Sequence, residues 1–282
     1  MSIIARLLKS VTSNNRLPKP QVAVDALQAK LTLAAYEALN PTQQIPYADG
    51  SAIYATPNQY TSWRVTSFFE KEPDTLKWIS TFQSGEVLVD VGANVGMYSI
   101  WAAKTRGVRV LAFEPESQNY ALLNKNIFLN GLSTLVTAYC CALSDERQFS
   151  TLYLSAFMPG GSCHTFGQEL DFNLQPLESA FTQGCYSATL DELVSTGAVP
   201  VPNHIKIDVD GLEHKVLAGC QVTLQHPLLR SVLVEINQGL PEHRAIVEKM
   251  VILGFSFDDD QVSTAVRKDG DFKGVGNYVF QR

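Results

Sequence analysis

The sequence predicts an α/β fold built on a mostly parallel sheet. Short apolar runs rich in β-branched residues, at 87–89 and 108–113, have the composition of strands that are covered on both faces. Good helix formers follow these runs, at 97–104 and 117–129. Because parallel strands need a crossover connection, usually a helix, this alternation after residue 85 indicates a parallel sheet.

A different pattern precedes the alternation. The elements expected there are a helix at 1–9, a linker with two prolines at 12–20, a helix at 22–39 that ends at Asn40-Pro41, a small hairpin at 47–62 and a helix at 66–82. The segment 1–9 is expected to pack as an ordinary helix, with a short amphipathic helix on a membrane or partner as the alternative. We therefore predict an N-terminal helical and hairpin extension over residues 1–82 and a main domain over residues 83–282.

The second half of the main domain continues the alternation after one interruption. The expected elements are a strand at 136–143, an extra strand at 151–154, a short helix opened by a capping box at Thr189-x-x-Glu192, a strand at 204–209, a helix at 212–217, a strand at 231–236 and a closing antiparallel pair at 254–258 and 277–281. Residues 146–188 form an insertion with a mobile loop at 158–162. An insertion of this length before a core strand commonly builds a substrate wall or lid.

The turn after the first core strand carries the most specific chemistry. Its glycines follow the spacing Gly92-x-x-x-Gly96 and are preceded by Asp90, whereas dinucleotide enzymes have G-x-G-x-x-G. An acidic residue that enters the loop repels a pyrophosphate but suits a ligand with an ammonium and a sulfonium, and S-adenosylmethionine carries both. Glu114, at the end of the next strand, can accept hydrogen bonds from two ribose hydroxyls.

On these residues the chain resembles class I S-adenosylmethionine-dependent methyltransferases, and among them the FkbM-type family. The most specific segments are Asp90-Val-Gly-Ala-Asn-Val-Gly-Met-Tyr-Ser99 and Lys206-Ile-Asp-Val-Asp-Gly-Leu-Glu213, supported by 113–115, 142–145, 189–193, 216–219 and 233–237. One position departs from the family, because Asp210 stands where its members usually have Glu, which keeps the charge and shortens the reach. The resemblance implies a Rossmann-like class I methyltransferase fold with a seven-stranded, mostly parallel sheet and a closing antiparallel strand.

The resemblance also implies an activity and a cofactor site. Members of the family mostly methylate hydroxyl groups, so the expected acceptor is a sugar hydroxyl in a glycan, a glycolipid or a glycosylated natural product. The expected cofactor-binding residues are Asp90, Gly92, Asn94, Gly96, Glu114, Ser144, Asp145 and Asp208. The alternatives are a methyltransferase of a non-sugar small molecule, an NAD-dependent oxidoreductase, and a degenerate fold that binds the cofactor without turnover.

Polar residues at the ends of the fourth and fifth core strands predict the catalytic centre. Strand alternation puts Lys206, Asp208 and Asp210 on one face of the fourth strand. Glu235 and Asn237 share a parity at the carboxyl end of the fifth, where open α/β sheets bind ligands. A purely structural alternative is an internal ion pair between Lys206 and one of the acids.

Two functional interpretations of this cluster remain open from the sequence. Methyl transfer to a hydroxyl requires removal of its proton, and Asp208 is the first choice of general base, with Asp210 and His214 as the others. Alternatively, Asp208 or Asp210 together with Glu235 and Asn237 holds Mg²⁺ through oxygen ligands, and the metal lowers the pKa of the acceptor hydroxyl.

Composition limits the partners that we expect. The net charge of -6 gives no basic field for polyanions, so nucleic acid is not an expected partner. Five cysteines without a C-x-x-C pair are typical of a reducing compartment, and with no apolar run long enough to span a membrane we expect a cytoplasmic protein. The expected partner is a small-molecule or glycan acceptor, and a homo-oligomer is left open.

Overall fold

The structure, a computed structural model, describes residue 35 and residues 38–282. The segments expected at 1–9 and 12–20, and most of the helix expected at 22–39, lie outside the described residues. Residues 42–282 belong to one unit of the fold. Among the described residues, no helix has the length and apolar character that crossing a membrane requires.

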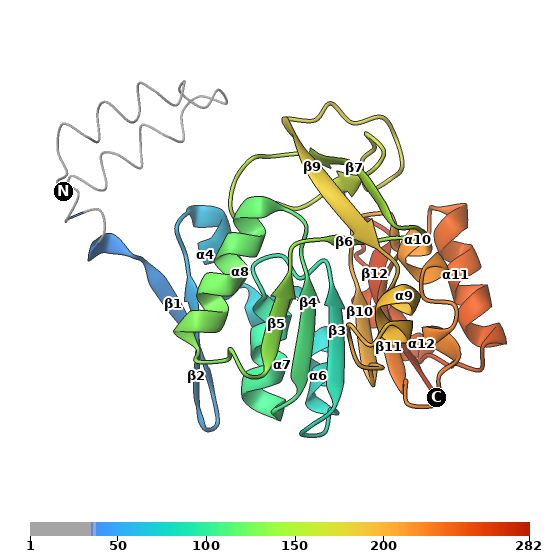
Figure 1. The fold of residues 1–282 in the computed structure, drawn as a ribbon, viewed down its shortest axis with the longest axis horizontal. Coiled ribbons are helices and arrows are strands. Elements are labelled where there is room, and N and C mark those ends of the chain that lie inside the picture. The colour runs from blue at the N-terminus through green and yellow to red at the C-terminus, as the bar shows by residue number, and fades with distance from the viewer. Residues whose placement is uncertain (1–34, 36–37) are drawn as a thin grey trace. The chain divides into compact units, whose positions relative to one another are not determined.

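Six strands form the main sheet of this unit (Figure 1). From one edge to the other they are β12 (Val275–Gln281), β11 (Ser231–Asn237), β10 (His204–Ile207), β3 (Val87–Val91), β4 (Arg109–Phe113) and β5 (Val136–Tyr139). Neighbouring strands are parallel except β11 and β12, which are antiparallel. The Rossmann-like α/β fold with a closing antiparallel strand is therefore confirmed.

The prediction of a seventh strand is wrong. Residues 254–258 contribute one antiparallel bridge, in which Ser256 and Gln281 exchange two backbone hydrogen bonds of 2.8 Å. The chain does not continue as a strand because Asp258 caps the next helix, α12 (Asp259–Ala265), by accepting hydrogen bonds from its first backbone N–H groups. Because Asp258 already serves as the N-cap of α12, the residues before it are too few to form a ladder of β-sheet hydrogen bonds.

The insertion and β6 (Ala142–Leu143), which directly precedes it, build a second, four-stranded sheet that lies above the carboxyl ends of the parallel strands in Figure 1. Its strands in spatial order are β6, β9 (Phe181–Ala188), β7 (Gln148–Leu154) and β8 (Thr165–Phe166). The strand expected at 136–143 is therefore split. Glu114 donates the last backbone hydrogen bond to Tyr139, and Pro115 has no N–H to continue that ladder, so β6 pairs with β9 instead.

Helices cover both faces of the main sheet. One face packs against the hairpin of β1 (Thr42–Tyr47) and β2 (Gly50–Ala55) and against α6 (Pro73–Ser80), α7 (Met97–Arg106) and α8 (Ser117–Leu129). The other face packs against α9 (Leu190–Ser195), α10 (Glu213–Ala218), the 3-10 helix η1 (Thr223–Gln225), α11 (Pro241–Ile252) and α12. The helices predicted at 97–104, 117–129 and 212–217 are confirmed to within two residues at each end.

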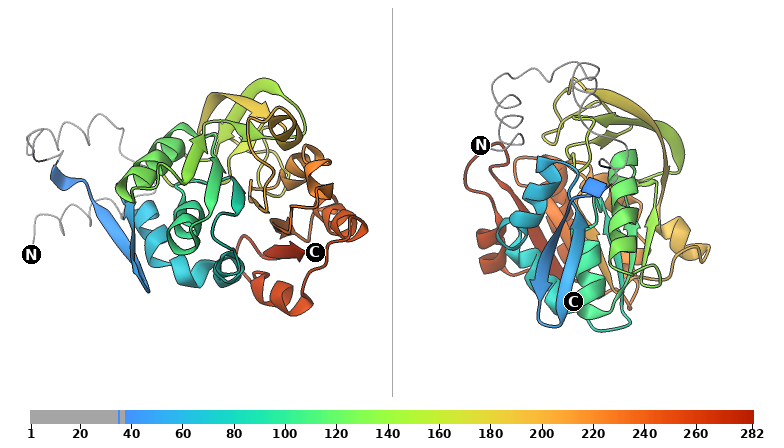
Figure 2. Two further views of the ribbon diagram at one scale, coloured as in Figure 1. Left: turned by 60° about the horizontal axis from the view of Figure 1, so that its bottom comes forward. Right: turned by 90° about the vertical axis from the view of Figure 1, so that its left-hand side faces the viewer.

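The segment that precedes the main sheet differs from the prediction. The hairpin spans residues 42–55 rather than 47–62, and β2 runs beside α8 (Figure 2), where Asn126 accepts a hydrogen bond from the backbone of Ala55. In place of one helix at 66–82 there are three, α4 (Gln59–Thr66), α5 (Phe68–Lys71) and α6. A capping box at Asn58 starts α4 early, and Pro73 opens α6. The domain boundary at residue 82 stays a prediction.

Candidate active site

A pocket, here called the main pocket, opens at the carboxyl ends of β3, β4 and β10, where the strand order reverses. It holds about 670 Å³ of empty space, its open mouth included. Its polar lining comes from the turn after β3, the end of β4, the first turn of α8, the residue after β6, the insertion and the loop after β10. These residues include Asn94, Glu114, Glu116, Asn119, Ser144, Ser162, His164, Asp208 and Asp210.

Two glycines shape the turn between β3 and α7. Gly92 has a φ of +78°, and a Cβ on it would lie 1.9 Å from the backbone oxygen of Asp208. Gly96 has a φ of +83°, and a Cβ there would lie 2.4 Å from Cδ1 of Leu123. The turn therefore runs directly against β10 on one side and α8 on the other, which only glycine permits.

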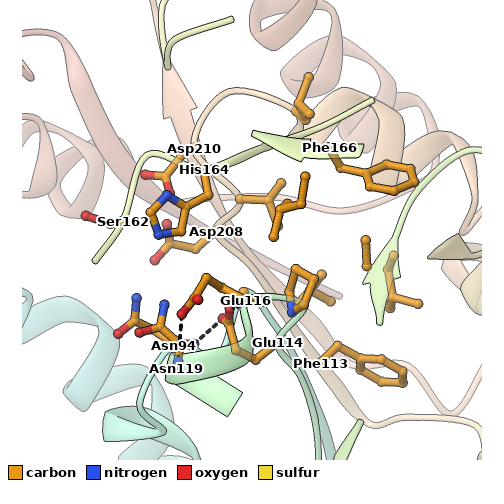
Figure 3. Close-up of a pocket in the computed structure, with 18 of the residues that line it drawn as sticks. Asn94, Phe113, Glu114, Glu116, Asn119, Ser162, His164, Phe166, Asp208 and Asp210 are labelled. Carbon is orange, nitrogen blue, oxygen red and sulfur yellow. Dashed lines mark hydrogen bonds between the residues drawn. The ribbon is translucent and has the colours of Figure 1, made fainter. Parts of the chain in front are cut away.

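Two carboxylates from the end of β4 lie on one side of the main pocket, and His164, Asp208 and Asp210 lie across from them (Figure 3). Glu114 accepts hydrogen bonds from the backbone N–H groups of Asn94, at 2.7 Å, and of Glu116, at 2.9 Å. Burial raises the pKa of Glu114 to about 7. Each oxygen of an ionised carboxylate accepts more than one hydrogen bond, so Glu114 is fixed by the backbone and still able to bind ligand hydroxyls.

The loop at 158–162, predicted to be mobile, is held by hydrogen bonds from several side chains, among them Asn94, Asn119 and Arg64. Asn94 donates a hydrogen bond of 2.7 Å to the carbonyl oxygen of Gly161, and Asn119 donates one of 3.0 Å to the same oxygen. Asn119 also accepts a hydrogen bond of 2.7 Å from the N–H of Gly160. Arg64 donates to the carbonyl oxygen of Gly160 from Nε, at 2.9 Å, and from Nη2, at 2.6 Å.

His164 places an unpartnered nitrogen in the main pocket. Its Nδ1 accepts a hydrogen bond of 3.3 Å from the backbone N–H of Ser155, so that the proton of the neutral ring is on Nε2. Burial lowers the pKa of His164 to about 4, and its Nε2 is buried without a hydrogen-bond partner in the part of the chain that the structure describes. A buried donor without a partner costs about 1–3 kcal/mol. A ligand acceptor in the main pocket would remove this cost.

The eight residues expected to bind a cofactor fall into two groups. Five of them line the main pocket: Gly92, Asn94, Glu114, Ser144 and Asp208. The other three, Asp90, Gly96 and Asp145, do not line it. Gly96 begins α7, and Asp145 accepts a hydrogen bond of 2.9 Å from Ser144 Oγ.

Asp90 lies beneath the pocket in a buried ionic cluster. It is 1% exposed, its Oδ2 accepts a hydrogen bond of 2.6 Å from Ser99 Oγ, and its Oδ1 lies 3.9 Å from Nζ of Lys206. Lys206 donates a hydrogen bond of 2.8 Å to Asp208. Burial lowers the pKa of Lys206, but Asp208 and Asp90 raise it more, so the ammonium stays charged. Lys206 thus forms the internal ion pair considered from the sequence, and Asp90 supports it.

A second space, here called the outer cleft, adjoins the main pocket and holds about 870 Å³, open solvent included. The two share Gly92, Asn94, Ser162, Asp208 and Asp210. The rest of the outer cleft is lined by three aromatic residues, three cations and one carboxylate: Tyr60, Trp63, Phe272, Arg64, Lys71, Arg267 and Glu235. Charged and aromatic groups therefore meet beside the main pocket.

Three carboxylates converge where the two spaces meet. One oxygen each of Asp208, Asp210 and Glu235 lies within 4.8 Å of the others. Asp210 has a φ of +55° and accepts a hydrogen bond of 2.7 Å from the backbone N–H of Cys163. Burial and the neighbouring Asp208 raise the pKa of Asp210 to about 7. Burial and Asp208 also raise the pKa of Glu235, although Arg267 donates a hydrogen bond of 3.1 Å to it.

Asn237 does not join this group. Its Nδ2 donates a hydrogen bond of 3.0 Å to Asn173, and its Oδ1 accepts one of 2.9 Å from the N–H of Gly239. The oxygen ligands that the structure brings together are thus Asp208, Asp210 and Glu235, rather than the set of Asp208, Glu235 and Asn237. Strand parity placed Asn237 correctly at the end of β11 but could not show that its amide is used by neighbouring loops.

A buried pair holds the loop that carries Asp208 and Asp210. Glu213 is 0% exposed and accepts hydrogen bonds from the backbone N–H groups of Val209, at 2.8 Å, and Gly211, at 3.0 Å. Nε2 of His243 lies 3.1 Å from Glu213, and its Nδ1 accepts a hydrogen bond of 3.0 Å from the N–H of Asn237. The pair therefore ties the loop after β10 to the end of β11.

His214, considered from the sequence as a base, lines neither the main pocket nor the outer cleft. Its ring centroid lies 6.2 Å from that of His243. Burial lowers the pKa of His214, which keeps the ring neutral. We therefore do not assign it to proton transfer.

Some residues that the site uses were not predictable from the sequence. Arg64 and Asn119 lie on helices far apart in the chain and meet only through the loop at 158–162. Glu116 could have been found, because an acidic residue directly before a predicted helix is a good N-cap, and it accepts hydrogen bonds from the first turn of α8.

Comparisons with known proteins identify the family. The model of the methyltransferase FkbM domain matches residues 90–257. The chain is 27% identical to the hexuronic acid methyltransferase AglP of Haloferax volcanii, over 63% of this chain and 67% of that one. It is 29% identical to the 31-O-demethyl-FK506 methyltransferase FkbM of Streptomyces tacrolimicus, over 54% and 66%. It is 37% identical to the methyltransferase sdnD of Sordaria araneosa, over 66% and 80%.

Among solved structures, precorrin-6y C5,15-methyltransferase of Geobacter metallireducens has a TM-score of 0.42 at 12% identity, over 74% of this chain and 86% of that one. The family model covers more than half of the chain and includes the turn after β3, both carboxylates at the end of β4 and the loop after β10. The chain therefore belongs to the FkbM family of S-adenosylmethionine-dependent methyltransferases.

Proposed function

We propose that this protein transfers a methyl group from S-adenosylmethionine to a hydroxyl oxygen, and that the acceptor is a sugar in a glycan, a glycolipid or a glycosylated natural product. The observation that carries the proposal is the position of Asp210, a carboxylate with a raised pKa where the main pocket meets the outer cleft. The relatives named for a hexuronic acid and for 31-O-demethyl-FK506 support an oxygen acceptor. We keep residues 83–282 as the proposed catalytic domain, with residues 1–82 as its extension.

The main pocket fits the adenosine part of the cofactor. Gly92 lets the turn after β3 line the pocket with bare backbone, Glu114 offers carboxylate oxygens for the ribose hydroxyls, and Nε2 of His164 is a buried donor without a partner among the described residues. Ser144 lies on the same lining and is available to the adenine. When bound, the cofactor supplies an electrophilic methyl group on a sulfonium, and the carboxylates near Asp208 suit that positive charge.

The outer cleft fits a sugar. Tyr60 is 41% exposed and Trp63 is 46% exposed, and both lie on α4 at the edge of the cleft, with their ring centroids 5.8 Å apart. Phe272 lies in the same lining, contributed by the loop before β12. Aromatic faces pack against the C–H faces of sugar rings, while the nearby carboxylates and cations can bind hydroxyl groups.

Asp210 is our proposed general base. A base works best at a pKa near the operating pH, and the pKa of Asp210 is raised to about 7. Asp208, the first choice from the sequence, already pairs with Lys206, and Glu235 already pairs with Arg267. Asp210 has no such cation partner within the described residues, so it is free to take the acceptor proton as the new carbon–oxygen bond forms.

Two alternatives to this proposal are less well supported. Mg²⁺ held by Asp208, Asp210 and Glu235 stays a hypothesis, because Lys206 and Arg267 already neutralise two of the three carboxylates. An NAD-dependent oxidoreductase conflicts with membership of a methyltransferase family. A non-sugar hydroxyl acceptor remains an outcome of the experiment.

The test is an acceptor screen with S-adenosylmethionine that carries a radiolabelled methyl group. The screen offers neutral and acidic monosaccharides, their glycosides, and non-sugar alcohols, amines and thiols of similar size. We expect label in a sugar product whose mass and fragmentation place the methyl on oxygen. Label that appears only in non-sugar alcohols would contradict the sugar acceptor, and label on nitrogen or sulfur would contradict O-methyl transfer altogether.

A further inference from the structure

Arg64 differs from the other cations of the outer cleft. Lys71 pairs with Glu72 at 2.8 Å, and Arg267 pairs with Glu235 at 3.1 Å. Within residues 38–282, Arg64 has no carboxylate within ion-pair distance. Within the described residues its two side-chain hydrogen bonds go to one carbonyl oxygen, that of Gly160, and a guanidinium has five N–H donors. Arg64 is thus a half-buried cation whose remaining N–H groups can donate hydrogen bonds to a ligand.

Arg64 also lines a smaller space of about 430 Å³, here called the inner cavity, at the first turn of α7. The inner cavity shares Gly92, Asn94 and Asp208 with the main pocket. A ligand whose ribose lies at Glu114 and which extends past Gly92 therefore enters the inner cavity. It meets three cations there, Arg64, Lys71 and Lys206, together with Asp208, which accepts a hydrogen bond of 2.8 Å from Lys206.

This mixture of charges fits an amino acid better than a single ion. The amino acid end of the cofactor carries an ammonium and a carboxylate. Asp208 is the carboxylate among the residues that line the inner cavity, and an ionised carboxylate can accept a hydrogen bond from the ammonium in addition to the one from Lys206. Arg64 matches the carboxylate, because a planar guanidinium donates two parallel hydrogen bonds to it. The first turn of α7 has no side-chain cap, so its backbone N–H groups favour the same negative charge.

From these observations we propose that Arg64 binds the carboxylate of the methionine part of S-adenosylmethionine. Through its bonds to Gly160, the same side chain joins the bound cofactor to the loop at 158–162. This inference rests on the proposed methyl donor. A carboxylate on the acceptor is the other source of the same chemistry, since Arg64 also lines the outer cleft.

The experiment compares two ligands that differ only in this carboxylate. Calorimetry gives the dissociation constants of S-adenosylmethionine and of decarboxylated S-adenosylmethionine for the wild-type protein and for Arg64→Met. The wild type should prefer the intact cofactor. In Arg64→Met the affinity for the intact cofactor should fall by about 10- to 100-fold, while that for the decarboxylated ligand changes by less than about threefold.

Two further variants complete the design. Arg64→Lys keeps the charge and loses the planar fork, so it should retain part of the preference for the intact cofactor. Arg109→Met removes one exposed cation at the amino end of β4 and should leave both dissociation constants unchanged. Far-ultraviolet circular dichroism of each variant checks that it is folded.

Each outcome has a distinct meaning. An equal loss of affinity for both ligands would overturn the inference and leave Arg64 as an anchor of the loop at 158–162. Unchanged affinity for both ligands would overturn it as well and assign the free donors to the acceptor. If neither ligand binds the wild-type protein, the proposed methyl donor itself fails.

Discussion

Asp210→Asn is expected to lower kcat by about 100- to 10,000-fold, the range that a general base contributes to a proton transfer. The substitution keeps the size of the side chain and its hydrogen bond from Cys163 but removes the proton acceptor. Affinity for S-adenosylmethionine should change by less than about fivefold, because Asp210 contacts the acceptor side. The measurement is steady-state kinetics with the best acceptor from the screen.

The raised pKa of Asp210 also predicts the direction in which kcat changes with pH. The carboxyl of Asp210 must be ionised to accept a proton, and its pKa is raised to about 7. In the wild-type protein kcat should therefore rise as the pH increases towards 7 and level off above it. The residual kcat of Asp210→Asn should not show this rise with pH.

Asp208→Asn is the comparison variant. If kcat no longer rises with pH below 7 in Asp208→Asn but still does so in Asp210→Asn, the base is Asp208, as the sequence first indicated. The assay is repeated with a chelator. We expect no further loss in the wild-type protein, and a loss that added Mg²⁺ restores would support the carboxylates as metal ligands.

Gly92→Ala should be the most damaging substitution outside the carboxylates. The added Cβ would lie 1.9 Å from the backbone oxygen of Asp208, at a φ of +78° that alanine rarely adopts. Overpacking and backbone strain together should lower the free energy of unfolding by about 2–4 kcal/mol. Relief of the clash must move β10 or the turn after β3, so cofactor binding should be lost as well. Urea unfolding and calorimetry measure the two effects.

Gly85→Ala is the matched control. Gly85 has a φ of +86°, but nothing lies within 4 Å of a Cβ placed there. The free energy of unfolding of Gly85→Ala should fall by about 1 kcal/mol from the backbone conformation alone, and its affinity for the cofactor should stay unchanged. Similar losses in the two variants, with normal cofactor binding by Gly92→Ala, would mean that the close approach of Gly92 to Asp208 has no functional role.

The cofactor side of the site was predictable because its determinants are local in sequence. The order of strand, glycine turn, helix and second strand fixes where Gly92 and Glu114 lie relative to each other. Five of the eight expected cofactor residues line the main pocket for this reason. Asp90 does not, because it faces α7 and sits beside Lys206 in the register of β3 and β10.

The acceptor side was much less predictable, since its residues come from segments far apart in the chain. The alternation of side chains along two strands located Asp208, Asp210 and Glu235. It could not show that Lys206 pairs with Asp208 and that Asp210 has no cation partner among the described residues. Trp63 and Arg64 belong to α4, which the sequence placed partly in a hairpin. The missing seventh strand has a similar cause, because the cap at Asp258 competes with strand pairing.

Glu114 is the residue that we propose holds the ribose of S-adenosylmethionine, and the other site assignments follow from it. The measurement is a calorimetric titration of the wild-type protein and of Glu114→Ala with S-adenosylmethionine. The wild-type protein is also titrated with NAD. Glu178→Ala, which removes an exposed carboxylate, is the control. We predict that the wild type binds S-adenosylmethionine and not NAD, and that Glu114→Ala weakens binding by about 1.5–3 kcal/mol through lost charged hydrogen bonds. Tighter binding of NAD, or unchanged affinity in Glu114→Ala, would contradict the cofactor site from which the other assignments follow.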